Sequence, residues 1–230
     1  MKIEFCIDSV EGAKAAKKFG ANRVELCSAL GVGGLTPSFG LIKHCAEVGV
    51  EVHVMIRHVE GCFVYSKEDV SIMLHDIKMA KDAGAKGVVF GCLTADNKLD
   101  VQPNIDLIEA AKNLELEVTF HRAFDFVENT SETLTSLINL GVDRILTSGQ
   151  HDKAINGIEN IKELVKQANG EIEIMAGSGV NKSNALELSQ TRIDALHFTI
   201  HKSSSEDEAL GMGSRTAIDE EKINSILNSL

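Results

Sequence analysis

The stretch Val52-His53-Val54-Met55-Ile56-Arg57 alternates branched apolar residues with histidine, methionine and arginine. This period of two predicts a β-strand, because successive side chains of a strand point to opposite faces. A second apolar run ends in Phe120-His121-Arg122-Ala123-Phe124-Asp125, which brings an imidazole, a guanidinium and a carboxylate together. A single trio of this kind is most simply a surface cap on a strand. Two segments of the same form indicate that their polar faces meet in one site.

Apolar runs of strand length alternate with amphipathic segments of helical period along the whole chain, eight of each. The predicted strands are residues 3–8, 23–27, 50–57, 87–93, 117–121, 144–148, 171–177 and 195–201. The predicted helices are residues 10–19, 39–48, 67–83, 105–114, 132–140, 155–168, 183–189 and 220–230. Candidate helix ends are Ser9 and Asn181 as N-caps, and Gly20, Gly49, Gly84 and Gly141 directly after helices.

Eight successive βα units in 230 residues predict an α/β fold of the closed (β/α)8 TIM-barrel type, with right-handed crossovers. We expect one domain over residues 1–230, in which only residues 202–214 form a flexible excursion. An open doubly wound sheet is the alternative architecture. The absence of a G-x-G-x-x-G motif after the first predicted strand weakens that alternative.

The charge balance is acidic, with 34 Asp and Glu against 23 Lys and Arg and a formal net charge of −11. No cluster of basic residues offers a surface for a phosphate backbone, so we expect neither nucleic acid nor an anionic membrane as partner. The chain begins with Met1-Lys2-Ile3 and leads straight into a predicted strand without a signal peptide, which predicts a cytoplasmic protein. In a reducing cytosol the five widely spaced cysteines are expected to be thiols.

The alternation of each strand predicts which side chains face the barrel interior, since helices cover the outer face and make it apolar. The strands at 87–93 and 144–148 do not alternate clearly, so their faces stay unassigned. The predicted inward residues are Glu4, Cys6, Asp8, Glu25, Cys27, His53, Met55, Arg57, Thr119, His121, Glu173, Met175, His197, Thr199 and His201.

This predicted interior is unusually polar, because branched apolar residues normally fill such barrels. Buried charges destabilise a fold unless they are paired or bind a ligand. Internal ion pairs, for example between Glu25 and Arg57, are one explanation. A functional cavity is the other, and the accumulation of polar residues toward the C-terminal strand ends favours it.

Cys6 and Cys27 lie on neighbouring predicted strands, and both face inward. Two thiolates near the Met55 thioether would form a soft ligand set, which selects Cu(I) over Mg²⁺ or Ca²⁺. Since free cysteine is also a common small core residue, a purely structural pair remains an alternative.

The stretch Gly177-Ser178-Gly179 ends the seventh predicted strand and opens a helix. Such a loop can expose backbone N–H groups to a phosphate or carboxylate, or it can simply turn the chain. Arg57, Arg122 and His121 are predicted near the same strand ends. Together they make a small anionic ligand a second possibility for the site.

With these residues in view, the chain resembles the CutC family of copper homeostasis proteins over essentially its whole length. The blocks that carry the resemblance are Glu4-Phe5-Cys6-Ile7-Asp8-Ser9, Arg23-Val24-Glu25-Leu26-Cys27, Gly33-Gly34-Leu35-Thr36-Pro37-Ser38, residues 53–57, 120–125, 146–150 and 175–180. The resemblance implies a TIM barrel, Cu(I) held by Cys6 and Cys27, and a cytoplasmic protein for which a homo-oligomer is compatible. One block departs from the family pattern. After Arg57 the family tends to have Pro-Arg-Gly-Gly, whereas this chain has His58-Val59-Glu60-Gly61 and then Cys62. His58 and Cys62 could therefore add soft ligands.

Two hypotheses about function follow. The first is a copper homeostasis protein that binds the copper ion as Cu(I) through Cys6 and Cys27. The second is a TIM-barrel enzyme of undetermined reaction on a small anionic or phosphorylated metabolite. In the second, Arg57, Arg122 and the loop Gly177, Ser178 and Gly179 would bind the anion, and Glu25, His121 or Asp125 would act as general acid or base.

Overall fold

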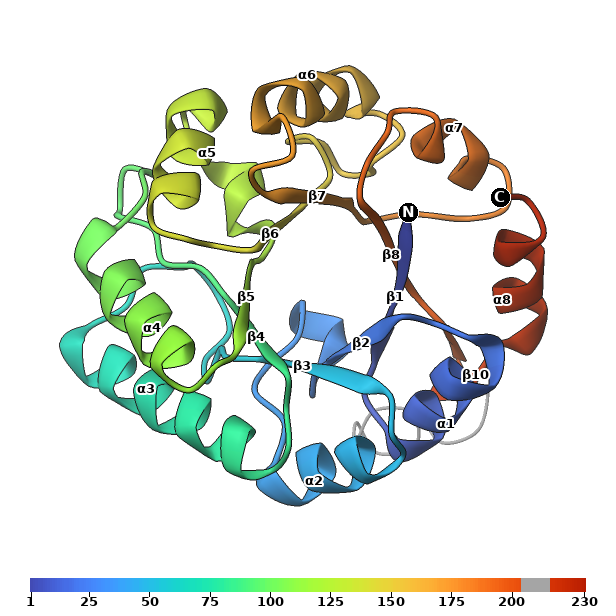
Figure 1. Cartoon of the computed structure of the whole chain (residues 1–230), viewed down its shortest axis with the longest axis horizontal. Helices are drawn as coiled ribbons and strands as arrows, with labels where there is room; N and C mark the ends of the chain where they lie inside the picture. The colour runs from blue at the N-terminus through green and yellow to red at the C-terminus, as the bar shows by residue number, and fades with distance from the viewer. Residues whose placement is uncertain (204–215) are drawn as a thin grey trace.

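The computed structural model describes residues 1–203 and 216–230, and its centre is a closed barrel of parallel strands in the order β1 to β8. Figure 1 views this ring of strands with the helices arranged around its outside. The TIM barrel predicted from the sequence is confirmed. The barrel strands are β1 (Lys2–Ile7), β2 (Arg23–Leu26), β3 (Glu51–Met55), β4 (Gly87–Phe90), β5 (Glu117–Phe120), β6 (Arg144–Thr147), β7 (Glu173–Ala176) and β8 (Ala195–Thr199).

Each strand is followed by helical sequence that returns the chain to the start of the next strand. Two short 3-10 helices, η1 (Leu30–Val32) and η2 (Arg122–Phe126), lie in the loops at the C-terminal ends of β2 and β5. In the described residues no helix is both long and apolar enough to cross a membrane. The α-helices are α1 (Val10–Phe19), α2 (Phe39–Glu47), α3 (Lys67–Asp82), α4 (Val101–Asn113), α5 (Thr130–Asn139), α6 (Ile158–Ala168), α7 (Ala185–Ser189) and α8 (Glu220–Leu227).

The helix ends explain why the pattern repeats so regularly. Ser9 caps α1 by accepting a hydrogen bond from the Gly12 N–H. Gly20 ends the same helix in the left-handed region at φ 72°, where an L side chain is disfavoured. The glycines after α2, α3 and α5 also have positive φ, so the repeated turn in the sequence is a repeated helix ending. Asn181 is not the cap of α7, because Asn184 holds that position and Asn181 accepts from Ser183 in the preceding turn.

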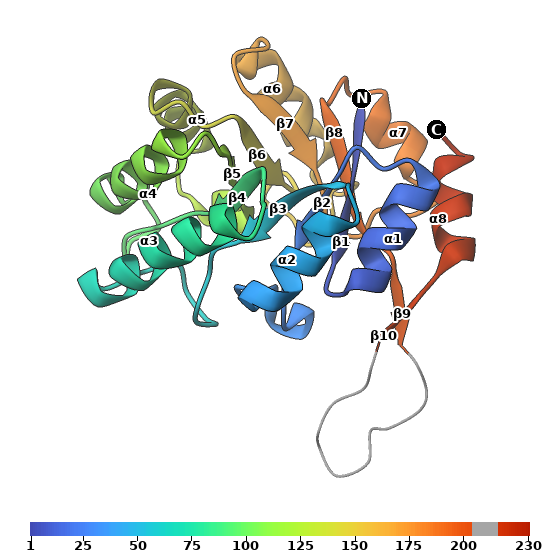
Figure 2. The same ribbon diagram turned by 60° about the horizontal axis from the view of Figure 1, so that its bottom comes forward.

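Several predicted boundaries shift by a few residues, and two of these shifts bear on the fold. Helix α4 begins at Val101 rather than at residue 105, since Pro103 lies in the first turn, where its missing N–H is not needed. The eighth strand ends at Thr199, and His201 belongs to β9 (His201–Ser203), which pairs antiparallel with β10 (Thr216–Ile218). Figure 2 shows this hairpin projecting from the barrel. Most of the predicted excursion at residues 202–214 lies outside the described residues.

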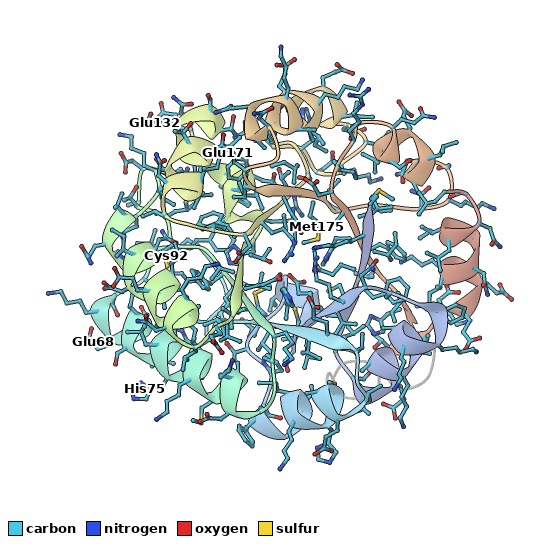
Figure 3. All side chains as sticks on the ribbon, in the orientation of Figure 1. Glu68, His75, Cys92, Glu132, Glu171 and Met175 are labelled. Carbon is cyan, nitrogen blue, oxygen red and sulfur yellow. The ribbon has the colours of Figure 1, made fainter. Side chains whose placement is uncertain are left out.

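The two faces of the strands differ as the alternation predicts. Outward residues such as Phe5, Val24 and Val54 are fully buried in the main apolar core against the helices. Figure 3 shows Met175 inside the ring of strands, whereas Glu68, His75 and Glu132 lie on the outer helices. The structure also assigns the two faces left open: Val89 of β4 packs with inward Cys6, and Leu146 of β6 packs with Met175.

Candidate functional site

Two buried arginines occupy the N-terminal half of the barrel interior. Arg23 pairs with Glu4, and its Nη1 lies 3.5 Å from Glu173. Arg144 contacts Glu173 at 2.7 Å and Glu117 at 2.9 Å. Both arginines are only 1% exposed, so their charges are stabilised by these carboxylates rather than by water. This layer closes the barrel below the site.

A histidine and two glutamates connect this layer to the middle of the barrel. His197 Nδ1 lies 2.7 Å from Glu4, and its Nε2 lies 3.7 Å from Glu25. Burial alone would raise the pKa of Glu4, but the hydrogen bond with His197 and the charge of Arg23 lower it well below its usual range. Burial raises the pKa of Glu25 to about 8. Burial lowers the pKa of His197, but Glu25, Cys6 and Glu4 outweigh this effect and raise it above the usual range.

Cys6 and Cys27 come together next to this group, at the C-terminal ends of β1 and β2. One ligand atom from each of Cys6, Cys27 and Glu25 can be chosen so that all lie within 4.8 Å of one another. The hydrogen bond with Cys27, followed by that with His197, lowers the pKa of the Cys6 thiol to about 5 against the effect of burial. The same bond raises the pKa of Cys27. The Cys27 thiol donates to Glu25 Oε2 at 3.6 Å, so the two cysteines and this carboxyl group form one buried cluster.

The surroundings of the two thiols are soft and closely packed. Cys6, Cys27, Met55 and Val89 form a separate buried cluster inside the barrel. A Cβ on Gly34 would lie 2.9 Å from Cys27 Sγ and 3.5 Å from the Met55 methyl, so the loop approaches both sulfur-bearing side chains. Met55 thus packs beside the two thiols and brings a soft thioether side chain to the same cluster.

A cavity of about 770 Å³ extends from the thiol pair to the loops at the C-terminal end of the barrel. Glu25, His197 and Cys6 line it, whereas Cys27 does not. Exposed apolar side chains, including Phe126, line its outer part. Its position at the C-terminal strand ends is where TIM-barrel enzymes carry their active sites.

Arg57 lines the cavity, but it does not form the ion pair with Glu25 that the sequence suggested. Its guanidinium instead donates to the carbonyl oxygens of Val32 at 3.0 Å, Gly34 at 2.9 Å and Gly61 at 3.1 Å. The loop after β2 offers the Val32 and Gly34 carbonyls, and the loop after β3 offers that of Gly61. Arg57 therefore holds two loops at the cavity wall.

His121 lines the same cavity and is buried among aromatic rings. Its ring centroid lies 4.8 Å from that of Phe63, which Arg57 approaches at 5.5 Å. The Ala123 N–H donates to His121 Nδ1 at 3.2 Å, so that His121 caps η2. Burial and the nearby charge of Arg57 lower the pKa of His121 to about 3, so its ring is neutral.

Arg122 and Asp125 bind each other rather than facing a common ligand. Arg122 Nε donates to Asp125 at 2.8 Å, and its Nη2 donates to the Ser148 hydroxyl at 2.9 Å. Asp125 also accepts from the backbone N–H of Ser148 and Gln150 and from the Thr147 hydroxyl. Arg122 lines the cavity, but Asp125 does not. The carboxylate holds the loop after β6.

This geometry makes a prediction for Asp125→Asn. The amide would keep one acceptor oxygen but lose the charge and half of the acceptors, so we expect the free energy of unfolding to fall by about 1 to 3 kcal/mol. Urea unfolding followed by circular dichroism measures this change. An unchanged stability would contradict the structural role assigned to this carboxylate.

The loop predicted to bind an anion is only partly directed at the cavity. Ser178 and Gly179 line it, whereas Gly177 does not. The Ser178 hydroxyl donates to the Asp152 carbonyl at 2.7 Å. The backbone of Ser178 has a positive φ of 84°. A Cβ on Gly177 would come within 3.1 Å of the His197 ring, so this glycine makes room for that histidine.

The residues that depart from the family pattern do not join the thiol pair. His58 Nε2 lies 2.9 Å from Asp69 at the start of α3. Cys62 is exposed and lines the cavity. Neither belongs to the groups of potential metal ligands found among the described residues.

Sequence reasoning missed the parts played by Arg23, Arg144 and Phe63. Arg23 carried a usable signal, since it lies two residues before inward Glu25 and therefore on the same face. Arg144 lies on the same face of β6 as the apolar Leu146, so alternation did not show which face of this strand points inward. Phe63 lies in the long loop between β3 and α3, where no periodicity indicates orientation.

Comparisons with known proteins agree with this architecture. A CutC family protein from Bacteroides fragilis is 46% identical over 96% of this chain and 91% of the relative. Another, from Glaesserella parasuis, is 45% identical over 86% of this chain and 82% of the relative. A crystal structure of CutC from Streptococcus agalactiae, a protein named for copper homeostasis, has a TM-score of 0.81 at 36% identity and covers 86% of this chain and 98% of that one.

More distant structures share the fold alone. A 3-hexulose-6-phosphate synthase superposes with a TM-score of 0.66 at 14% identity, over 100% of both chains.

The CutC family model matches residues 1–202, which contain the whole barrel and both inward cysteines. This chain therefore belongs to the CutC family.

Proposed function

We propose that this protein takes part in copper homeostasis and binds the copper ion as Cu(I) through Cys6 and Cys27. The observation that carries the proposal is the pair of inward thiols, which lie with Glu25 within 4.8 Å of one another. The name of the Streptococcus agalactiae relative supports copper handling. The free thiols of all five cysteines support a cytoplasmic location.

The donor set fits Cu(I) chemically. Thiolates with a nearby thioether, Met55, are soft ligands, and soft ligands favour Cu(I). Metal binding requires deprotonated cysteines, and the lowered pKa of the Cys6 thiol favours its thiolate form. The Glu25 Oε1 atom has no hydrogen-bond partner among the described residues and adds a polar atom on this wall.

An anaerobic Cu(I) titration against a competing chelator tests the proposal. We expect one Cu(I) per chain, with Cys6→Ser and Cys27→Ser each lowering the affinity by more than the roughly 10- to 100-fold loss typical of an outer-shell partner. The background should carry Cys62→Ser, because this exposed thiol could bind copper independently.

Cys45→Ser and Cys92→Ser are the matched controls. Both residues are buried, and burial raises the pKa of each thiol, that of Cys45 to about 11. They lie in the apolar core between strands and helices, away from the barrel interior. Equal losses in the control variants and in the Cys6 and Cys27 variants would contradict the proposal.

The size of the cavity favours a second function. A volume of about 770 Å³ is within the range of small-molecule sites and far larger than a single ion requires. A TIM-barrel enzyme acting on a small anionic or phosphorylated metabolite would use Arg57, Arg122 and the Ser178 to Gly179 loop to bind the anion. Glu25 and His121 are its candidate acid and base groups, whereas Asp125 would first have to leave its hydrogen bonds.

A further inference from the structure

Arg57 is a buried cation without a counter-ion. It is 5% exposed, and among the described residues no carboxylate oxygen lies within ion-pair distance of its guanidinium. Its terminal N–H groups make three hydrogen bonds to backbone carbonyls, but Nε has no hydrogen-bond partner in the described part of the chain. The hydroxyl of Tyr65 lies near the guanidinium, yet it too lacks a partner and lies outside the cavity. A buried charge of this kind is costly unless something compensates it.

His121, which lines the same cavity, carries a second unpaired donor. It is 4% exposed, and its Nε2 has no partner within residues 1–203 and 216–230. The Ala123 N–H donates to Nδ1, so Nδ1 must carry the lone pair of the neutral ring. The proton therefore lies on Nε2, which becomes a hydrogen-bond donor.

The two donors flank one aromatic side chain. The Phe63 ring lies 4.8 Å from the His121 ring and 5.5 Å from the Arg57 guanidinium carbon. Phe126 packs against Phe63 at 5.6 Å and is 58% exposed at the outer part of the cavity. One wall thus combines a cation, a neutral donor and aromatic surface.

We propose that Arg57 and the His121 Nε2–H form a docking point for the carboxylate of a small organic acid whose apolar body lies against Phe63 and Phe126. A carboxylate supplies the negative charge that Arg57 lacks and has two oxygens for the two donors. A phosphate has more oxygens than these two donors satisfy. Arg122 also lines the cavity, but its Nε and Nη2 already donate to Asp125 and Ser148, so Arg57 is the cation that lacks a carboxylate.

This inference shares one premise with the second proposed function, namely that an anion binds in the cavity. The docking point does not require that the bound acid reacts. A bound acid that is not converted would leave the docking point standing and refute the enzyme. It is also independent of copper, so the experiment uses reduced, copper-free protein.

Isothermal titration calorimetry with three probes of similar shape tests the proposal. The probes are 3-phenylpropionate, its uncharged amide and 2-phenylethyl phosphate. We expect the acid to bind at least about tenfold more tightly than the amide, as a hydrogen bond to a charged group implies. Equal binding of acid and amide, or no binding of the acid at millimolar concentration, would overturn the proposal. Tighter binding of the phosphate would overturn the carboxylate assignment.

Two variants at His121 separate its donor from its structural role. His121→Asn keeps an acceptor for the Ala123 N–H and removes the Nε2 donor, so affinity for the acid should fall about tenfold while the amide is little affected. His121→Gln returns an N–H near the Nε2 position and should recover part of that affinity. His75→Asn, the same substitution at an exposed histidine of α3, is the matched control. Equal effects of His75→Asn and His121→Asn would refute the docking point, with folding checked by circular dichroism.

Discussion

Replacing Arg23 with methionine should lower the free energy of unfolding by about 3 to 5 kcal/mol. Arg23 is 1% exposed and pairs with Glu4, which is equally buried. Without the guanidinium, the buried Glu4 carboxylate keeps the His197 ring as its one ion-pair partner within the described residues. Breaking a buried pair from one side leaves a charge that has lost part of its compensation and has no access to water. Equilibrium unfolding in urea measures the loss.

The control for this variant is Lys18→Met. Lys18 also pairs with a glutamate, Glu220, at 2.8 Å, but these side chains are 60% and 53% exposed. Such a surface pair contributes at most about 1 kcal/mol. The double variant Arg23→Met/Glu4→Leu should recover part of the stability, because it removes both buried charges. Similar losses for Arg23→Met and Lys18→Met would contradict the stabilising role assigned to the buried pair.

Acidification should destabilise the wild type more than a His121→Asn variant. In the unfolded chain His121 takes up a proton near the usual histidine pKa of 6.5, whereas burial and the charge of Arg57 lower its folded pKa to about 3. Between these pH values the unfolded state binds more protons, so stability falls as the pH falls, by about 1.4 kcal/mol per pH unit. We therefore expect a loss of about 3 kcal/mol from this residue between about pH 6.5 and about pH 4.

The measurement is the unfolding free energy of both proteins at these two pH values. Carboxylates such as Glu4, whose folded pKa is also lowered, contribute to both proteins and cancel in the comparison. The wild type should lose about 3 kcal/mol more than His121→Asn over this range. Equal losses would mean that the His121 ring is protonated in the folded state, and Nδ1 could then not accept from the Ala123 N–H.

Much of the fold could be predicted from local sequence because its signals repeat. Strands such as β3 alternate strictly, and the helix endings at Gly20 and Gly84 use the same left-handed glycine. Alternation also predicted the inward direction of Cys6 and Cys27, since a parallel barrel leaves only two faces. Two thiols on neighbouring strands of one face must then lie close together.

The partners of the charged side chains could not be predicted in the same way. Arg57 faces the interior as expected, but the carbonyls that bind it come from Gly34 and Gly61 in irregular loops. Asp125 binds a loop from the next βα unit rather than the cavity. Alternation fixes the face of a strand residue, but loop conformation decides what that residue meets.

X-ray absorption at the copper edge, on the one-to-one Cu(I) complex of the Cys62→Ser protein, would show directly whether the barrel thiols bind copper. We predict a first shell in which sulfur from Cys6 and Cys27 dominates, and loss of that signal in Cys6→Ser/Cys27→Ser. A first shell of nitrogen and oxygen only, or one unchanged in the double variant, would contradict copper binding by Cys6 and Cys27.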